Sequence, residues 1–300
     1  MYDIIIIGGG PAGLTAAIYS RRANKSVLVI EKGSFGGQIT YSPKVENIPG
    51  FISLTGNEFA EKLVEQSLNL GAEIECAEVT KIIDGDIKTV ITDDGEEFTS
   101  KSIIIATGAK HRMLGIEKEE KFVGEGISFC AVCDGAFYEN KTVAVIGGGN
   151  SALQEALLLS DLASKVYVIQ NLDYLTGEDK LSEQLKQKEN VEIILNNVVE
   201  SIIGEDEFKG IIAKDNSGNT TELYLDGMFV AIGLIPQNEQ FSFLIELDEK
   251  GYAISDESCI TKSNGIVVAG DCRAKKIRQV LTAASDGAIA ALAACDYIKD

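Results

Sequence analysis

Residues 2–20 read YDIIIIGGGPAGLTAAIYS, and this stretch decides the fold. The apolar run before the glycines is typical of a buried strand, and the residues after them have the pattern of a helix. Gly8, Gly10 and Gly13 give the spacing G-x-G-x-x-G, which permits a tight turn, close approach of a pyrophosphate, and close packing of helix on strand. The stretch therefore predicts a dinucleotide-binding turn whose helix N-terminus faces phosphate groups.

The acidic residue Glu31 ends the next predicted strand, SVLVIEKG (26–33). A carboxylate at this position can accept hydrogen bonds from both ribose hydroxyls of a bound dinucleotide. A glycine motif alone is a weak indication, and a tight structural turn is the alternative. The succession of strand, glycines, helix, strand and terminal acid favours the nucleotide site.

The same pattern occurs again 139 residues further along the chain. KTVAVIGGGNSALQEALLLS (141–160) repeats the strand, turn and helix, and KVYVIQNL (165–172) stands at the place of the second strand. Gly147 and Gly149 keep the turn, and Ala152 replaces the third glycine, which is a permitted variant. The repeat predicts an α/β fold with two Rossmann-like, three-layer ββα dinucleotide-binding domains.

The second unit lacks the side chains that would hold the ribose end of a nucleotide. Gln170 stands at the position of Glu31, so NAD would lose its carboxylate partner. Asn171 and Leu172 follow where NADP would need arginines. Two interpretations stay open: Gln170 makes one hydrogen bond and NAD(P) binds weakly, or the fold is kept and the nucleotide is lost.

The composition limits the classes of function. The chain has 300 residues, 45% hydrophobic and 24% charged, which predicts a soluble globular protein. Its 27 basic and 46 acidic residues give a net charge of −19, so nucleic acid is not an expected partner. The start MYDIIIIGGG lacks a basic signal-peptide region, and no apolar run reaches the roughly 18 residues that cross a bilayer. We expect no membrane association and a cytoplasmic location.

Two of the six cysteines form the motif CAVC, Cys130 and Cys133. The spacing brings two sulfur atoms within reach of a disulfide, and a helix N-terminus lowers the pKa of a thiol. Zinc would need two more ligands, but the chain has one histidine, His111, and no second C-x-x-C, so no metal is expected. The motif predicts a redox-active pair, with two incidental core cysteines as the alternative.

The other four cysteines, Cys76, Cys259, Cys272 and Cys295, are solitary and receive no functional role. Cys76 alternates with charged residues in AEIECAEV, which predicts that it lies on the core face of a strand. Cys272 is interpreted as a small buried residue.

Short motifs extend over the whole chain: GGGPAG (8–13), GGQI (36–39), VENIPGF (45–51), IIATGA (104–109), CAVCDG (130–135), VIGGGNSA (145–152), FVAIGLIP (229–236), GIVVAGD (265–271) and RQVLTAASDG (278–287). Together they resemble the low-molecular-weight thioredoxin reductase family. The resemblance implies that the first unit binds FAD through its glycine turn and Glu31. It assigns further cofactor contacts to Gly36, Gly37, Gln38, Asn47, Thr107, Gly108, Asp271, Arg278, Gln279 and Val280.

The resemblance also explains the order of the units along the chain. Residues 1–113 and 240–300 are expected to form a discontinuous FAD-binding domain, and residues 114–239 an inserted NAD(P)-binding-like domain that carries the CxxC. Within the insert the pattern predicts strand 141–146, helix 150–160, strand 165–170, helix 181–188, strand 191–195 and a hairpin near 208–224.

The resemblance gives each residue of the dithiol motif a role. Cys133 would face the flavin, and Cys130 would attack the disulfide of thioredoxin, the expected protein partner. Asp134 would protonate the leaving thiolate. Capping of the helix that follows is the alternative role of Asp134. The family pattern also predicts a homodimer.

The chain departs from the NADPH-dependent members of the family, which carry H-R-R-x-x-x-R after the second strand of the insert. The corresponding residues here are Gln170, Asn171, Leu172 and Thr176. Loss of charge-assisted phosphate contacts argues against NADPH. The chain is similar to the ferredoxin-dependent flavin thioredoxin reductases, which implies reduced ferredoxin as the electron donor.

Two other functions stay open at this stage. One is an NADPH- or NADH-dependent thioredoxin reductase with an atypical nucleotide site, and the other is a flavin redox sensor that does not turn over. Ferredoxins are usually acidic, so the charge of −19 opposes their docking. The basic clusters RRANK (21–25), KHR (110–112) and RAKKIR (273–278) could offset this repulsion, although such clusters are more often solvated surface.

Overall fold

The computed structural model describes residues 1–42 and 44–299. They form two compact units: Met1–Lys110 with Ile235–Asp300, and His111–Leu234, which is inserted into the first. The crossings predicted from the sequence were 113/114 and 239/240, and the cofactor of each unit stays a prediction. Strands β7 (Ala109–His111) and β16 (Leu234–Pro236) pair where the chain passes between the units.

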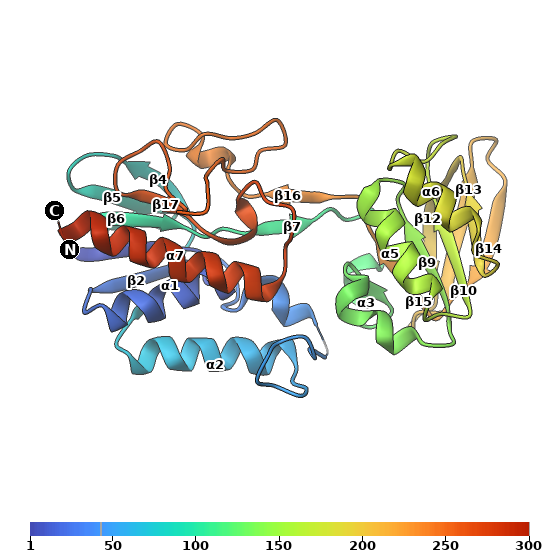
Figure 1. Cartoon of the computed structure of the whole chain (residues 1–300), viewed down its shortest axis with the longest axis horizontal. Helices are drawn as coiled ribbons and strands as arrows, with labels where there is room; N and C mark the ends of the chain where they lie inside the picture. Colours follow the sequence, from blue (N-terminus) through green and yellow to red (C-terminus); the bar gives the residue numbers. More distant parts are fainter. Residues whose placement is uncertain (43, 300) are drawn as a thin grey trace. The chain divides into compact units, whose positions relative to one another are not determined.

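A mainly parallel sheet forms the centre of the first unit (Figure 1). Its order is β3-β2-β1-β6-β5-β4, in which β4 and β5 run antiparallel, and β17 pairs with the end of β6. The strands are β1 (Tyr2–Ile7), β2 (Val27–Glu31), β3 (Glu73–Cys76), β4 (Val79–Ile83), β5 (Lys88–Thr92), β6 (Glu97–Ile105) and β17 (Ile266–Val268). Because β1 and β2 are parallel, the glycine turn and Glu31 lie at the same edge of the sheet.

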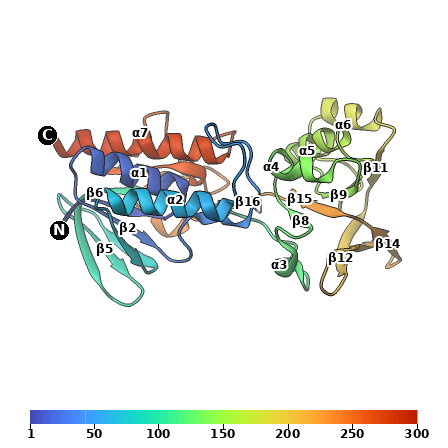
Figure 2. The ribbon, with the colours of Figure 1, turned by 90° about the horizontal axis from the view of Figure 1, so that it is seen from below.

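Both faces of this sheet are covered, which explains the run of four isoleucines. Ile4 and Ile6 belong to the core beneath the helices, and Ile5 and Ile7 to the core on the other face, because successive side chains of a strand point in opposite directions. Helices α1 (Pro11–Arg22), α2 (Gly56–Asn69) and α7 (Val280–Lys299) lie together on one face (Figure 2).

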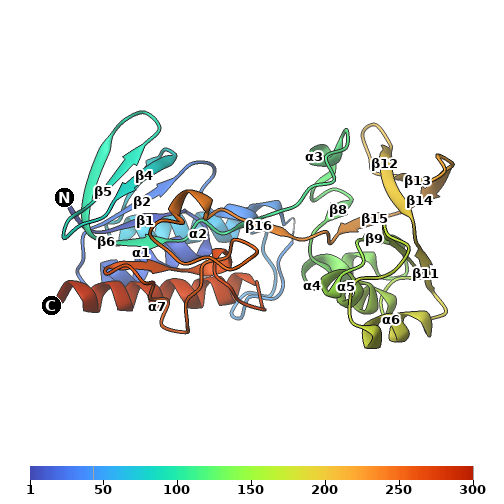
Figure 3. The same ribbon diagram turned by 90° about the horizontal axis from the view of Figure 1, so that it is seen from above.

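The inserted unit has a parallel sheet with the order β11-β10-β9-β15-β8. Helices α5 and α6 cover one face, and the antiparallel strands β12-β13-β14 cover the other (Figure 3). The elements are β8 (Ile127–Ser128), β9 (Thr142–Ile146), α5 (Asn150–Ser160), β10 (Lys165–Ile169), α6 (Asp179–Lys186), β11 (Val191–Ile194), β12 (Asn197–Ile203), β13 (Gly210–Asp215), β14 (Thr220–Tyr224) and β15 (Gly227–Val230).

Several short helices complete the chain: η1 (Gly37–Tyr41), α3 (Glu119–Phe122), α4 (Ala131–Asp134), η2 (Gly135–Tyr138), η3 (Glu239–Phe241) and η4 (Gly270–Cys272). The α/β fold class predicted from the sequence is confirmed. Helix α6 begins at Asp179, two residues before the predicted start at 181, and β12 was not predicted. Within residues 1–42 and 44–299, every helix is too short or too polar to cross a membrane.

Candidate dithiol and dinucleotide sites

The first glycine turn links β1 to α1, and two of its glycines are required by the protein's own backbone. Gly8 has φ +112°, and a Cβ there would lie 2.3 Å from the carbonyl oxygen of Ala106. A Cβ on Gly13 would lie 1.8 Å from the carbonyl oxygen of Gly8. These contacts fix the turn and bring the start of α1 against the end of β1.

Gly10 differs from the other two glycines of the motif because a Cβ at this position would make only ordinary van der Waals contacts with the protein. A Cβ on Gly10 would approach its nearest neighbours, the Gly36 oxygen and the Gly37 Cα, only to 3.9 Å. Its backbone is extended, with φ −80° and ψ −175°, which any residue can adopt. Folding alone therefore does not require glycine here, whereas close approach of a ligand to the backbone does.

Glu31 is tied directly to the turn. Its Oε2 accepts a hydrogen bond of 2.7 Å from the Gly9 N–H, and its Oε1 accepts one of 2.8 Å from the Gly33 N–H. The Gly36 N–H donates to the Gly9 carbonyl at 2.8 Å. Each carboxylate oxygen has a second lone pair available for a ligand hydroxyl. The structure thus brings Glu31, Gly36 and Gly37 together with the glycine turn.

Asp271, in η4, lies at the same end of α1. A Cβ on the preceding Gly270 would be 2.7 Å from the Cβ of Ala12, so the two segments touch. Asp271 Oδ1 is buried and has no hydrogen-bond partner among the described residues, although Lys275 Nζ lies 3.3 Å away as an ion pair. Burial raises the pKa of Asp271, and Lys275 opposes the rise. A buried carboxylate oxygen that is held by one ion pair has a lone pair left to accept a ligand hydroxyl.

The remaining predicted cofactor residues lie on connected segments of the first unit. Asn47 Nδ2 donates to Gln279 Oε1 at 3.4 Å, and Val280 begins α7. The Arg278 guanidinium lies over the ring of Tyr252 at 4.0 Å. Gln38 lies in η1 and is exposed.

Thr107 and Gly108 follow β6, and here the structure adds a residue that the sequence analysis missed. Thr107 Oγ1 donates to Asn238 Oδ1 at 3.4 Å. Asn238 is fully buried, and its Nδ2 donates to the carbonyl oxygens of Cys272 (2.7 Å) and Gly251 (2.9 Å). Its partners lie far away in sequence, so no local pattern indicates it.

A buried charge cluster beside Asp271 was also missed. Asp286 on α7 pairs with Arg273 at 2.8 Å and with Lys275 at 3.0 Å, and its Oδ2 accepts from the Gly270 N–H at 3.1 Å. Two basic residues of the RAKKIR cluster therefore point into the protein, which contradicts their predicted place on a solvated basic surface. The burial of Asp286 explains this, because a buried carboxylate must be paired.

The dithiol motif lies in the inserted unit, at α4. Cys130 and Cys133 form a disulfide, and both are partly exposed. The Cys130 N–H donates to Ser128 Oγ at 3.1 Å, and the Ser128 hydroxyl donates to Asp134 Oδ2 at 2.6 Å. Asp134 is thereby linked to the first cysteine through one hydroxyl group.

Asp134 is a half-buried acid, and its side chain does not cap the helix that follows. It stands at the N-cap position of η2 but makes no side-chain cap hydrogen bond within the described structure. Its Oδ1 is buried without a hydrogen-bond partner in the described part of the chain. Burial raises the pKa of Asp134, and the hydrogen bond from Ser128 partly opposes this. A raised pKa favours the protonated form of this carboxyl, which is the form that can donate a proton.

The second glycine turn keeps its shape but is covered by its own chain. The Gln170 side chain packs over Gly148, where an added Cβ would lie 2.5 Å from Gln170 Nε2. Gln170 is 5% exposed, and its Nε2 donates to the Tyr174 carbonyl at 3.3 Å. The side chain at the ribose-reading position is therefore engaged with its own loop.

The loop that follows also contacts the start of α5. The N–H groups of Thr176 and Gly177 both donate to the Gly148 carbonyl at 2.8 Å. The Glu178 N–H donates to Asn150 Oδ1 at 2.7 Å, and Asn150 Nδ2 donates to Glu178 Oε1 at 3.1 Å. The Glu178 carboxylate is therefore hydrogen-bonded to Asn150, the first residue of α5. Its negative charge beside the helix N-terminus is unfavourable for an anionic phosphate.

Comparison with known proteins covers the whole chain. The pyridine nucleotide-disulphide oxidoreductase family matches residues 2–287. A thioredoxin reductase of Listeria innocua is 40% identical over 304 residues, covering 100% of this chain and 95% of the relative. The solved structure of thioredoxin reductase from Streptococcus pyogenes MGAS5005 matches with a TM-score of 0.94 at 39% identity, covering 100% of this chain and 98% of that one. The chain belongs to the thioredoxin reductase family.

Membership of the thioredoxin reductase family confirms the resemblance seen in the sequence and identifies an oxidoreductase with a C-x-x-C disulfide. It also implies FAD. The first unit fits this cofactor on two observations: the protein itself does not require glycine at position 10, and the buried Oδ1 of Asp271 accepts no hydrogen bond from the described residues. The individual cofactor contacts and the electron donor remain predictions.

In this thioredoxin reductase family member, burial raises the thiol pKa of Cys259, Cys272 and Cys295. Cys272 is fully buried, and burial raises the pKa of its thiol to about 11. The prediction that Cys76 faces the core is wrong: it is exposed at the last position of β3, an edge strand that pairs with β2. His111 is stacked on Phe129 at 4.6 Å, and burial lowers its pKa to about 4.

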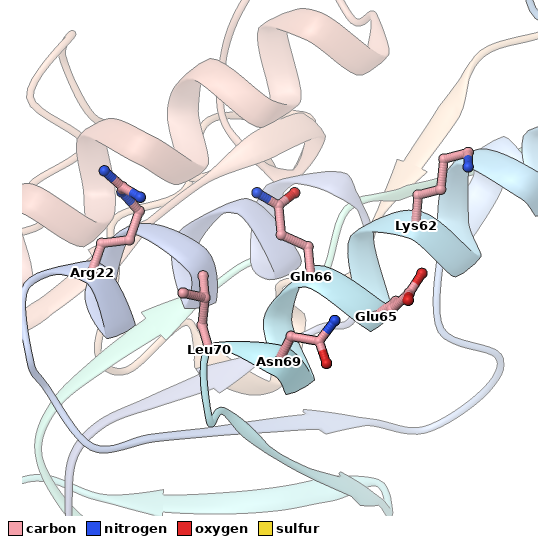
Figure 4. A pocket seen from close by; sticks show the side chains of 6 residues that line it. All are labelled: Arg22, Lys62, Glu65, Gln66, Asn69 and Leu70. Atoms are coloured by element: carbon pink, nitrogen blue, oxygen red, sulfur yellow. The ribbon is translucent and has the colours of Figure 1, made fainter.

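A pocket on the first unit lies at the C-terminal end of α1, opposite to the glycine turn. It is lined by Arg22, Lys62, Glu65, Gln66, Asn69 and Leu70 (Figure 4). Charges of both signs occur in this lining, which combines Arg22 at the end of α1 with side chains of α2 and its C-cap residue Leu70. We assign no ligand to it.

Proposed function

We propose that this chain reduces thioredoxin through FAD and the Cys130–Cys133 disulfide, with electrons from reduced ferredoxin. The observation that carries the choice of donor is the state of the second glycine turn. Gln170 packs on Gly148, and neither it nor Asn171, Leu172 or Thr176 can form an ion pair with a phosphate.

FAD would be held by the first unit. The turn around Gly8, Gly10 and Gly13 would bind the diphosphate. Glu31 would accept hydrogen bonds from the ribose hydroxyls, and Asp271 Oδ1 would accept one from a hydroxyl of the ribitol chain. The other expected contacts are Gly36, Gly37, Gln38, Asn47, Thr107, Gly108, Arg278, Gln279 and Val280. When bound, FAD supplies a carrier that accepts electrons one at a time and delivers them as a pair.

The dithiol motif would pass the electron pair to thioredoxin. Reduction of the Cys130–Cys133 bond requires two electrons and, to form two thiols, two protons. Cys133 would receive the electrons from the flavin, and the Cys130 thiolate would then attack the thioredoxin disulfide. Asp134 would protonate a sulfur atom, and the supporting observation is that its carboxyl is hydrogen-bonded to Ser128, whose hydroxyl oxygen accepts from the Cys130 N–H.

The magnitude of the missing contacts argues against NADPH. A hydrogen bond to a charged group contributes about 1.5–3 kcal/mol, so even two of the three missing arginines would account for a roughly 10²–10⁴-fold weaker binding. The long-range field of a chain with net charge −19 repels the nucleotide as well.

The same charge opposes an acidic ferredoxin, so docking requires a local basic surface. Lys110 and Arg112 of the KHR cluster are exposed and remain available. Arg273 and Lys275 of the RAKKIR cluster are engaged with Asp286. We therefore place the ferredoxin contact near Lys110 and Arg112. Exchange of both for glutamine should weaken reduction by ferredoxin and leave the flavin content unchanged.

Anaerobic titration of the flavin absorbance tests the donor. Reduced ferredoxin should bleach the flavin stoichiometrically, and NADPH or NADH at micromolar concentration should not. The matched variant carries Gln170→His, Asn171→Arg, Leu172→Arg and Thr176→Arg, and it should gain reduction by NADPH. Bleaching of the wild type by either nucleotide would establish the alternative, a nucleotide-dependent enzyme with an atypical site. Reduction without transfer to thioredoxin would indicate a redox sensor.

A further inference from the structure

Glu155 is a half-buried acid in the inserted unit that the proposed function does not use. It lies on α5, and its Oε2 is buried without a hydrogen-bond partner among the residues that the structure describes. Burial and, to a smaller extent, the charge of Asp134 raise the pKa of Glu155 to about 8. A glutamate in this state holds its proton at neutral pH.

The second acid of this region is Asp134, on the neighbouring helix α4. Helix α4, which ends at Asp134, packs against α5. The Asp134 Oδ1 atom is the second unpartnered carboxyl oxygen of this region, since its Oδ2 is occupied by the Ser128 hydroxyl. Two carboxyl groups that sense each other, each with one free buried oxygen, cannot both ionise without a large cost.

The other titratable groups near this pair do not supply a compensating positive charge. Tyr138 of η2 is itself subject to the charge of Asp134, and burial raises its pKa to about 12. On β10, Lys165 pairs with Glu192 at 2.8 Å. The further titratable side chains on the elements packed against α5 are Tyr167 on β10 and Asp179, Lys180, Glu183 and Lys186 on α6.

We propose that Glu155 is a positioning residue of the dithiol site that shares a proton with Asp134 and resupplies it. The inference rests on the reduction of the Cys130–Cys133 bond proposed above. When two electrons from the flavin break the S–S bond, the shared proton passes from Glu155 to Asp134, and the Asp134 carboxyl gives it to one sulfur. The other sulfur stays a thiolate, and Glu155 regains a proton from solvent. Each cycle of this relay delivers one solvent proton to one sulfur.

Infrared spectroscopy of the oxidised, FAD-loaded protein tests the proton directly and needs no electron donor. The carbonyl stretch of a protonated carboxylic acid should disappear with a midpoint near pH 8. This component should be absent in Glu155→Gln. In Asp134→Asn the midpoint should fall, because the charge of Asp134 contributes to holding the proton on Glu155.

Asp161→Asn is the matched control. Asp161 follows α5, is exposed, and pairs with Lys188 at 2.5 Å, so the titration should be unchanged. Persistence of the component in Glu155→Gln, or an unchanged midpoint in Asp134→Asn, would overturn the inference. If Glu155→Gln does not fold, the Asp134→Asn result still decides.

A kinetic measurement separates a proton relay from simple packing. The rate of thiol formation after photoreduction of the flavin should fall roughly tenfold in Glu155→Gln, less than the 10²–10⁴-fold contribution of a direct general acid. It should also lose its dependence on pH near 8. An unchanged pH profile would contradict the relay. Failure of ferredoxin to reduce the flavin would count against the proposed donor alone, because photoreduction bypasses it.

Discussion

Gly10→Ala and Gly8→Ala form a matched pair that distinguishes a cofactor cradle from a structural turn. A methyl group on residue 10 would have 3.9 Å to its nearest protein atoms, and the backbone there is extended. The apoprotein should therefore keep its stability, or gain about 0.4–1 kcal/mol from the reduced freedom of the unfolded chain. FAD should bind at least about tenfold more weakly, because the methyl group occupies the space beside the helix N-terminus.

Gly8→Ala should have the opposite profile. Its Cβ would lie 2.3 Å from the Ala106 carbonyl, and φ of +112° disfavours alanine. We expect a loss of about 2–4 kcal/mol in the apoprotein. Urea unfolding of the flavin-free proteins, together with the ratio of flavin to protein absorbance after purification, measures both quantities. Full FAD content in Gly10→Ala, or equal destabilisation by both changes, would refute the cradle and favour a purely structural turn.

Three further predictions follow from buried groups. Asp271→Asn should weaken FAD binding about 10- to 100-fold in a fluorescence titration, because Oδ1 is lost as a charged acceptor. Asp296→Asn, on the exposed part of α7, should leave FAD binding unchanged. Iodoacetamide at pH 7 should label the exposed Cys76 but not Cys272, whose pKa is raised to about 11; labelling of Cys272 by mass spectrometry would show that its burial is wrong. Because the folded pKa of Glu155 is about 8, above the ordinary 4.5, the unfolded chain ionises first as pH rises, and stability is lost across this window. Glu155→Gln should therefore be more stable relative to wild type at pH 8 than at pH 5, by a few kcal/mol in urea unfolding, and an equal difference at both values would contradict the raised pKa.

The features that the sequence predicted are those that local pattern encodes. Strand β1 was indicated by its isoleucines, and the spacing of the glycines that follow predicted a turn; in the structure Gly8 lies against the Ala106 carbonyl. The repeat at Gly147 identified the second unit, since the same strand and turn residues recur in the same order. The disulfide between Cys130 and Cys133 needs no long-range information.

The features that were missed depend on contacts between distant parts of the chain. Asn238 joins Thr107 to Cys272, and neither separation leaves a periodic signal. Lys275 was assigned to a solvated cluster because its neighbours are basic, but Asp286 on α7 draws it inward. Alternation placed Cys76 on a core face, yet the strand lies at the edge of the sheet, where the burial that alternation assumes is incomplete.

The return of residues 174–178 onto the second glycine turn has no counterpart in a sequence pattern. Thr176 and Gly177 bond the Gly148 carbonyl through their backbone, so any residue type except proline could do so. The sequence showed that arginines are missing, but only the structure shows that Gln170 packs against the turn itself. The second glycine turn therefore lacks arginines to bind a phosphate, and Gln170 occupies its ribose-reading position.

Thiol counting after anaerobic reduction by ferredoxin tests the central claim, which is the passage of an electron pair from FAD to the dithiol. The protein is alkylated at successive times and the modified cysteines are identified by mass spectrometry. The account predicts two new thiols per chain, at Cys130 and Cys133, and no turnover with thioredoxin in Cys133→Ser. A flavin that is reduced and reoxidised by thioredoxin while the Cys130–Cys133 disulfide stays intact would contradict it.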